Sequence, residues 1–227
     1  MKDLTDNIDK TENIEPTKPS ENKFEEGSQL QKDAPANVEK SLEENALSPK
    51  EDVADGRLHE LSPETQENLA SFNEANWENM DADAREEKCK DLYNSACDDM
   101  GVSKENRPEL RFVSDEEFNE KCSAGGSDPE NTKAFYLSDD HDKAVYMKQS
   151  DLENPDVESS DLANTVGHEA RHVYQREAVD DMYENGLSEK DAEYGFNCDQ
   201  SFRKDKEFTE QDADNYGNQF SDWLEDN

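Results

Sequence analysis

The sequence predicts an α+β domain that follows a disordered acidic tail. Apolar residues recur with helical spacing in several segments after about residue 65, and two β-rich runs are separated by a polar turn typical of a hairpin. The first 64 residues show neither pattern. We therefore expect a tail over residues 1–64 and one folded domain over residues 65–227.

The predicted tail is poor in residues that form a core. It holds five of the eight prolines and a single aromatic residue, Phe24, among many Glu, Lys, Asn and Ser residues. Such a segment cannot bury enough apolar surface to offset the entropy lost on ordering. It is either a passive linker or a recognition segment for export or for a partner.

The charge balance excludes several classes of partner. Sixty acidic residues against 24 basic residues give a net charge of −36, which repels DNA, RNA and anionic membranes. The start of the chain, residues 1–6, lacks the apolar run of a signal peptide, and no segment approaches the roughly 20 apolar residues of a membrane span. We expect a soluble protein, cytoplasmic or exported without a cleaved signal peptide. No nucleic acid and no membrane is expected as a partner.

Two helical regions open the predicted domain. The first covers residues 64–79, and the second covers residues 81–100 and stops at Gly101, a favoured residue at the end of a helix. Cys89 and Cys97 share an apolar helical stripe, which indicates buried thiols. No pair of cysteines has the C-x-x-C spacing of a structural zinc site.

A small antiparallel sheet is expected next. Residues 110–113 are a candidate strand, and a capping box at residues 114–117 predicts a short helix that ends near Gly125 and Gly126. Residues 134–137 and 144–147 are β-rich runs that predict a hairpin. His141 lies in its turn, where a solvated side chain is expected rather than a metal ligand.

The next helix carries the motif that points to chemistry. Residues 164–175 contain His-Glu-x-x-His, and histidines four residues apart on a helix can direct both imidazoles at one metal ion. Glu169 points about 100° further round the axis, where it can reach a water on the metal without being a ligand. The histidine face lies beside an apolar stripe made of Leu162, Val166, Ala170 and Val173.

A catalytic zinc site needs a third protein ligand, and a later helix offers one. Residues 209–224 have one firmly apolar face, and Glu210 lies at its margin, where its carboxylate can turn toward a metal on the other helix. Asp214 shares that margin and is the main rival, while Asp212 lies on the opposite margin. These acids can alternatively serve only to complement the helix dipole.

These residues resemble a known group of enzymes. His168 to His172 with the downstream pattern Glu210-x-x-Ala213-x-x-Tyr216-Gly217 resembles the gluzincins, zinc metallopeptidases with a glutamate on a later helix as third ligand. The string Thr165 to Gln175 after a hairpin also resembles uncharacterised bacterial and phage metallopeptidase domains, some of them associated with toxins. The resemblance covers about residues 70–227 and implies a zincin-like fold: a small antiparallel sheet, an active-site helix and flanking helices.

The resemblance also implies a mechanism. One Zn²⁺ per chain would be bound by His168, His172 and Glu210, and Glu169 would act as general base in peptide-bond hydrolysis. Transition-state donors would come from Tyr or Arg side chains. Tyr194 and Tyr216 are the candidates, while Tyr174 and Arg171 are expected to serve packing and a surface ion pair.

Two other classes of function stay open. A catalytically inactive zinc-binding module would keep the histidines but would not need Glu169. An acidic protein-interaction module would need no metal at all, so chelators would leave its fold unchanged. A delivered bacterial toxin or effector and a housekeeping peptidase would share the same site, and the long tail favours delivery slightly.

Overall fold

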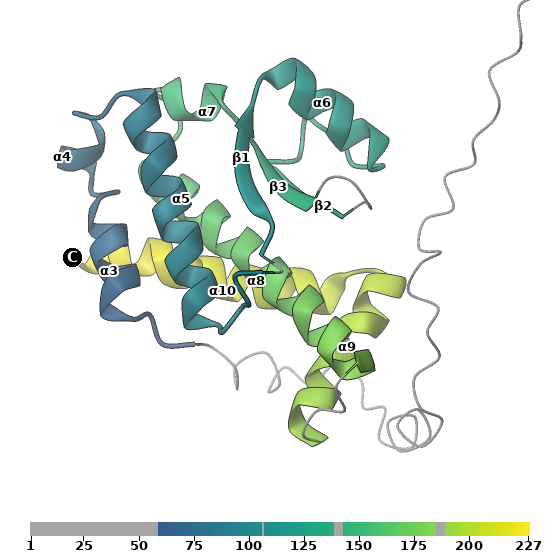
Figure 1. Ribbon diagram of the computed structural model, residues 1–227. Helices are drawn as coiled ribbons and strands as arrows, with labels where there is room; N and C mark the ends of the chain where they lie inside the picture. The colour runs from purple at the N-terminus through teal and green to yellow at the C-terminus, as the bar shows by residue number, and fades with distance from the viewer. Residues whose placement is uncertain (1–58, 106, 139–142, 185–188) are drawn as a thin grey trace, which may run out of the picture. The chain divides into compact units, whose positions relative to one another are not determined.

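The computed structural model describes residues 59–105, 107–138, 143–184 and 189–227, which form a mostly helical α+β fold (Figure 1). The α+β prediction is therefore confirmed. None of the described helices is long and apolar enough to cross a membrane. In chain order the elements are α3 (Pro63–Ala70), α4 (Glu74–Trp77), α5 (Ala82–Asp99), β1 (Glu109–Val113), α6 (Asp115–Ala124), β2 (Ala134–Ser138), β3 (Lys143–Lys148), α7 (Ser150–Glu153), α8 (Ser159–Glu184), α9 (Glu189–Arg203) and α10 (Glu207–Asp226).

The predicted tail lies outside the described residues as far as residue 58. Its last residues belong to the folded part. The ring of His59 lies edge-on to that of Tyr174, with 5.2 Å between centroids, and Leu61 packs against the main core. Since α3 begins at Pro63, the folded part includes the end of the segment that composition had assigned to the tail.

Local capping sets several helix starts. The side chains of Ser62, Asp81 and Ser114 each accept a hydrogen bond from the backbone N–H three residues on. The predicted helix start at Ser114, whose side chain caps α6, and the helix ending before Gly101 are confirmed. The single helical region expected over residues 64–79 is instead two helices, because the side chain of Asn73 caps a new start at α4.

The sheet has the order β1-β3-β2 and is mixed rather than antiparallel. The predicted hairpin is confirmed, since β2 and β3 are antiparallel. The prediction for β1 was wrong: it runs parallel to β3, with Leu110 opposite Val145. A parallel pair needs a long crossover, and the chain between the two strands supplies one that contains α6 and β2. Both β1 and β2 are edge strands.

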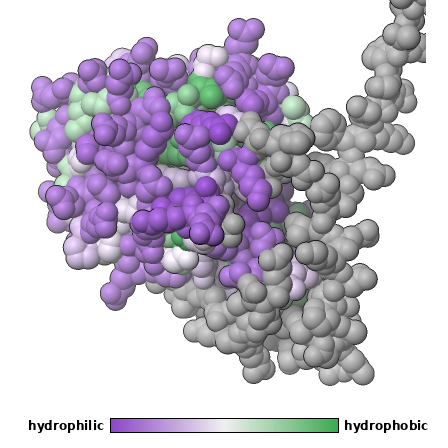
Figure 2. Space-filling view, viewed as in Figure 1, coloured by the Kyte–Doolittle hydropathy of each residue, from purple (hydrophilic) through white to green (hydrophobic). Residues whose placement is uncertain are grey.

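Helix α8 lies at the centre of the fold, in contact with α5, α9, α10 and β2. Its predicted apolar stripe is buried in the main core. All four cysteines are free and buried, as expected for Cys89 and Cys97. Hydrophilic residues cover most of the described surface on the face in Figure 2, in keeping with the charge of the chain. Ser159, one of three residues expected to precede α8 as caps, is its first residue.

Helix α10 approaches α8 closely at Gly217. A Cβ atom on Gly217 would lie 2.7 Å from the backbone oxygen of Asn164 and 3.3 Å from the backbone nitrogen of His168. Glu210 precedes Gly217 by seven residues, two helical turns, so both lie on the side of α10 that faces α8. Because Gly217 has no side chain, α10 can lie close to α8. This distance between the two helices determines how near Glu210 lies to the histidines of α8.

The variant Gly217→Ala is expected to lose about 1–3 kcal/mol of unfolding free energy, because the new methyl group meets backbone atoms that cannot rotate away. The displaced helix should also weaken the binding of any zinc ion that Glu210 helps to hold. Urea unfolding and zinc titration measure the two effects. Gly125→Ala is the control, since its nearest atom would lie at an ordinary 3.5 Å, and a loss there equal to that at Gly217 would contradict the explanation.

Candidate metal centre

Helix α8 places both histidines of the motif on one side. Their Nε2 atoms are 3.0 Å apart, and the rings lie edge to face. The two side chains are mostly buried but reach solvent, with 19% of His168 and 14% of His172 exposed. The convergence follows from the spacing of four residues on one helix.

Helix α10 brings a third donor to the same point. Oε2 of Glu210 lies 3.5 Å from Nε2 of His168 and 3.5 Å from Nε2 of His172. A tetrahedral zinc ion with ligand bonds of about 2.0–2.1 Å holds its donors about 3.3 Å apart. The three separations bracket that value, so the three side chains could hold a metal ion with bonds of this length. His168, His172 and Glu210 are the one such group of metal-ligating side chains found among the described residues.

The second nitrogen of each imidazole has a partner of its own. Nδ1 of His168 lies 3.0 Å from Oδ1 of Asp214, and Nδ1 of His172 lies 2.8 Å from Oε1 of Gln175. Both partners can accept a hydrogen bond, and in the tautomer with the hydrogen on Nδ1 each Nε2 offers its lone pair to a metal. Asp214, the rival for third ligand, therefore contacts the outer nitrogen of His168 and is not in the donor group.

The short distances between Glu210 and the two histidines shift the pKa values of these groups. Hydrogen bonds from His168 and His172 lower the pKa of Glu210 far below its ordinary value, although burial acts the other way. Burial lowers the pKa of His168, but Glu210, Glu169 and Asp214 more than offset it and raise that pKa. The carboxylate of Glu210 is thus ionised, the form that binds a metal.

Glu169 lies on the inner side of α8 next to the histidines. It is 5% exposed, and its Oε2 atom has no hydrogen-bond partner among the described residues. Burial raises the pKa of its carboxyl, and interactions with His172 and His168 act in the opposite direction. A buried carboxyl oxygen without a partner is costly, so Glu169 beside the donor group is a candidate for a role in chemistry.

A buried ion pair connects α8 to α10 beneath the cluster. The guanidinium of Arg171 donates two hydrogen bonds to Asp212, at 2.8 and 2.9 Å, and both side chains are fully buried. Gln175 donates to Oδ2 of Asp212 at 2.8 Å and to the backbone oxygen of Thr209 at 2.9 Å. The expectation of a surface ion pair for Arg171 was wrong, because α10 covers that side of α8.

Of the two tyrosines named as donors, only Tyr194 has its hydroxyl bound to another described residue. The hydroxyl of Tyr194 donates to Oδ2 of Asp212 at 2.7 Å, and Tyr216 is fully buried with a hydroxyl that lacks a partner in the described part of the chain. Tyr174 packs its ring against the guanidinium of Arg171, as expected for a packing residue. His141 lies outside the described residues.

Two parts of this site were missed in the sequence. Gln175 belongs to the recognised string but was given no role, although its position three residues after His172 would have allowed contact on one helix face. The pairing of Arg171 with Asp212 left no local signal.

Comparison with protein-family models, curated proteins and solved structures finds no match to this chain.

Proposed function

We propose that this chain is a zinc-dependent peptidase of the gluzincin type, with a zincin-like domain over the folded part. The observation that carries the proposal is the convergence of His168, His172 and Glu210 at tetrahedral spacing, with the unpaired carboxylate of Glu169 adjacent. A binding module would have no need for a buried, unsatisfied carboxylate at that place. The Glu210-x-x-Ala213-x-x-Tyr216-Gly217 pattern supports the gluzincin type.

The residues divide the chemistry among them. A zinc ion held by His168, His172 and Glu210 would act as a Lewis acid on a peptide carbonyl and lower the pKa of water toward about 7. Glu169 accepts the proton of the attacking water on its carboxylate and later donates it to the leaving amine. Asp214 and Gln175 hold the imidazoles in the tautomer that keeps both Nε2 atoms available.

The sheet offers a place for the substrate backbone. Strand β2 is an edge strand and contacts α8, the helix that carries the histidines. An extended peptide that pairs with a free strand edge gains backbone hydrogen bonds independent of its sequence. Strand addition to β2 would lead a peptide past the zinc ligands, which favours a peptide substrate over a small molecule.

The first test is zinc content, measured by elemental mass spectrometry on untagged protein. Wild type should carry about one zinc per chain, while His172→Ala and Glu210→Ala should lose it, because two remaining ligands bind zinc weakly. Asp214→Asn should still bind zinc with an affinity lowered about 10- to 100-fold, as expected for an orienting partner.

Asp222→Asn is the matched control, since Asp222 is exposed on the same helix and should leave zinc content unchanged. Wild-type protein that stays free of zinc after incubation with the ion would overturn the proposal in favour of an acidic interaction module. Loss of zinc in Asp214→Asn with retention in Glu210→Ala would exchange the two assigned roles.

A further inference from the structure

Arg176 differs from the other described arginines in having no polar partner. Every other one donates at least one hydrogen bond to an oxygen atom; these are Arg85, Arg107, Arg111, Arg171 and Arg203. The described part of the chain supplies no hydrogen bond or ion pair to the guanidinium of Arg176, which is only partly exposed. Five N–H donors with a strict planar geometry are thus left for a ligand or for water.

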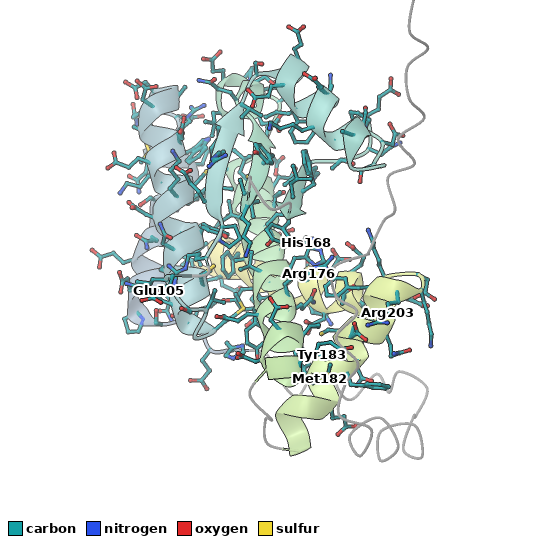
Figure 3. The ribbon with its side chains drawn as sticks, turned by 45° about the vertical axis from the view of Figure 1, so that its right-hand side comes forward. Glu105, His168, Arg176, Met182, Tyr183 and Arg203 are labelled. Atoms are coloured by element: carbon teal, nitrogen blue, oxygen red, sulfur yellow. The ribbon has the colours of Figure 1, made fainter. Side chains whose placement is uncertain are left out.

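The position of Arg176 relates it to the metal centre. It follows His172 by four residues and His168 by eight on α8, so it lies on the same side of the helix, with its Cα about 6 Å beyond that of His172. Figure 3 labels both His168 and Arg176 on α8. An extended peptide advances about 3.3–3.6 Å per residue, so one turn of α8 corresponds to about two residues of a peptide bound along this helix.

The guanidinium is held in a fixed orientation. Its Cζ atom lies 3.7 Å from the centroid of the Phe202 ring on α9. Such stacking fixes the plane of the guanidinium while its N–H groups, which lie in that plane, remain free. Arginine presented in this way matches a carboxylate, which accepts two parallel hydrogen bonds.

The acidic groups nearby do not supply that carboxylate. Burial lowers the pKa of Arg176, and Tyr136, Asp180 and Asp199 interact with it electrostatically in the opposite sense. The two oxygens of Asp199 already accept hydrogen bonds from Arg203 at 2.9 Å and from Tyr183 at 3.1 Å. Tyr136 belongs to β2, the edge strand that contacts α8, and Phe202 belongs to α9, so both elements adjoin the part of α8 that carries Arg176.

We propose that Arg176 binds a carboxylate of the peptide substrate next to the scissile bond, which makes it a determinant of specificity for acidic peptides. This inference rests on the proposed peptidase function. The carboxylate is either an Asp or Glu side chain or the C-terminus of the peptide. In a chain with a net charge of −36, a local cation is what allows an acidic substrate to bind.

The test compares matched peptides at 0.15 M salt, so that long-range repulsion is screened over about 8 Å. Decapeptides carry Glu or Gln at each position in turn, and each is made with a free carboxyl or a carboxamide at its C-terminus. Cleavage rates give kcat/KM. Wild type should favour one acidic form by about tenfold or more, the effect of one charge-assisted bidentate pair. A position-specific preference for Glu identifies a side chain, and a preference for the free carboxyl identifies the C-terminus.

In Arg176→Gln that preference should disappear, while kcat/KM for the neutral amidated peptides stays within about twofold and zinc content is unchanged. Arg176→Lys should recover only part of the preference, because an ammonium group lacks the two parallel N–H donors of a guanidinium. Lys204→Gln is the control for the change in charge, since Lys204 is exposed after α9. In wild type, equal kcat/KM for Glu and Gln at every position, and for free and amidated C-termini, would overturn the inference.

A binding measurement separates this inference from the peptidase function. Full-length Glu169→Gln protein with its metal is titrated with the acidic and neutral decapeptides, and the Nε–Hε resonance of Arg176 is followed by NMR. The acidic peptide should shift that resonance, and adding Arg176→Gln should weaken binding by about tenfold. If wild type cleaves no peptide, the proposed peptidase function is wrong. If the acidic peptide also leaves the Nε–Hε resonance of Arg176 unshifted, the inferred carboxylate binding by Arg176 is wrong as well.

Discussion

Glu169→Gln is expected to lower kcat for peptide hydrolysis by about 10²- to 10⁴-fold and to leave zinc content at the wild-type value. Glutamine matches glutamate in size but cannot accept the proton of the attacking water. Glu169 is not in the donor group formed by the two histidines and Glu210, so the metal should remain. Single-turnover cleavage of a peptide, measured together with elemental analysis of the same sample, tests both statements.

Stability provides an independent check on Glu169. The carboxylate is 5% exposed and one of its oxygens has no partner among the described residues, so removing its charge should not lower the thermal midpoint. Glu158→Gln is the control, because Glu158 is exposed just before α8. A Glu169→Gln variant that keeps more than about a tenth of the wild-type kcat would assign the general base to another group.

Local periodicity was sufficient to predict the half of the site that lies on α8. The spacing of His168 and His172 follows from one helix, and the burial of Glu169 follows from the apolar stripe beside it. Glu210 was harder, because choosing it over Asp214 depends on where α10 crosses α8. That crossing is set by the close approach of Gly217 to Asn164. Since pattern alone gives no crossing point, Asp214 remained a rival.

Features that join distant segments could not be predicted. The direction of β1 depends on the path of the chain through α6 and the hairpin, and the short strand-like segment 110–113 is compatible with either direction. The pairing of Arg171 with Asp212 joins residues 41 positions apart. In the sequence each is an ordinary polar residue on a helix, and only the covering of α8 by α10 makes both fully buried.

The variant Asp212→Ala is expected to cost about 3–5 kcal/mol of unfolding free energy, because it leaves the guanidinium of Arg171 buried without a counter-ion. Three donors lose the same acceptor: Arg171, Gln175 and Tyr194. Urea unfolding of the chelated protein measures the cost without a contribution from the metal. The exposed Asp222→Ala on the same helix should change stability by less than about 0.5 kcal/mol. A cost below about 1 kcal/mol for Asp212→Ala would mean that water reaches the guanidinium.

Replacing both partners distinguishes the role of the pair in stability from its role at the metal centre. Arg171→Met with Asp212→Leu removes both charges, so the fold should recover much of the stability lost in Asp212→Ala. Zinc affinity should not recover to the same extent. Without Asp212, Gln175 keeps only the backbone oxygen of Thr209 as acceptor, and its hold on Nδ1 of His172 loosens. A stable double variant that still binds zinc more weakly than wild type would show that the buried pair positions a ligand as well as joining two helices.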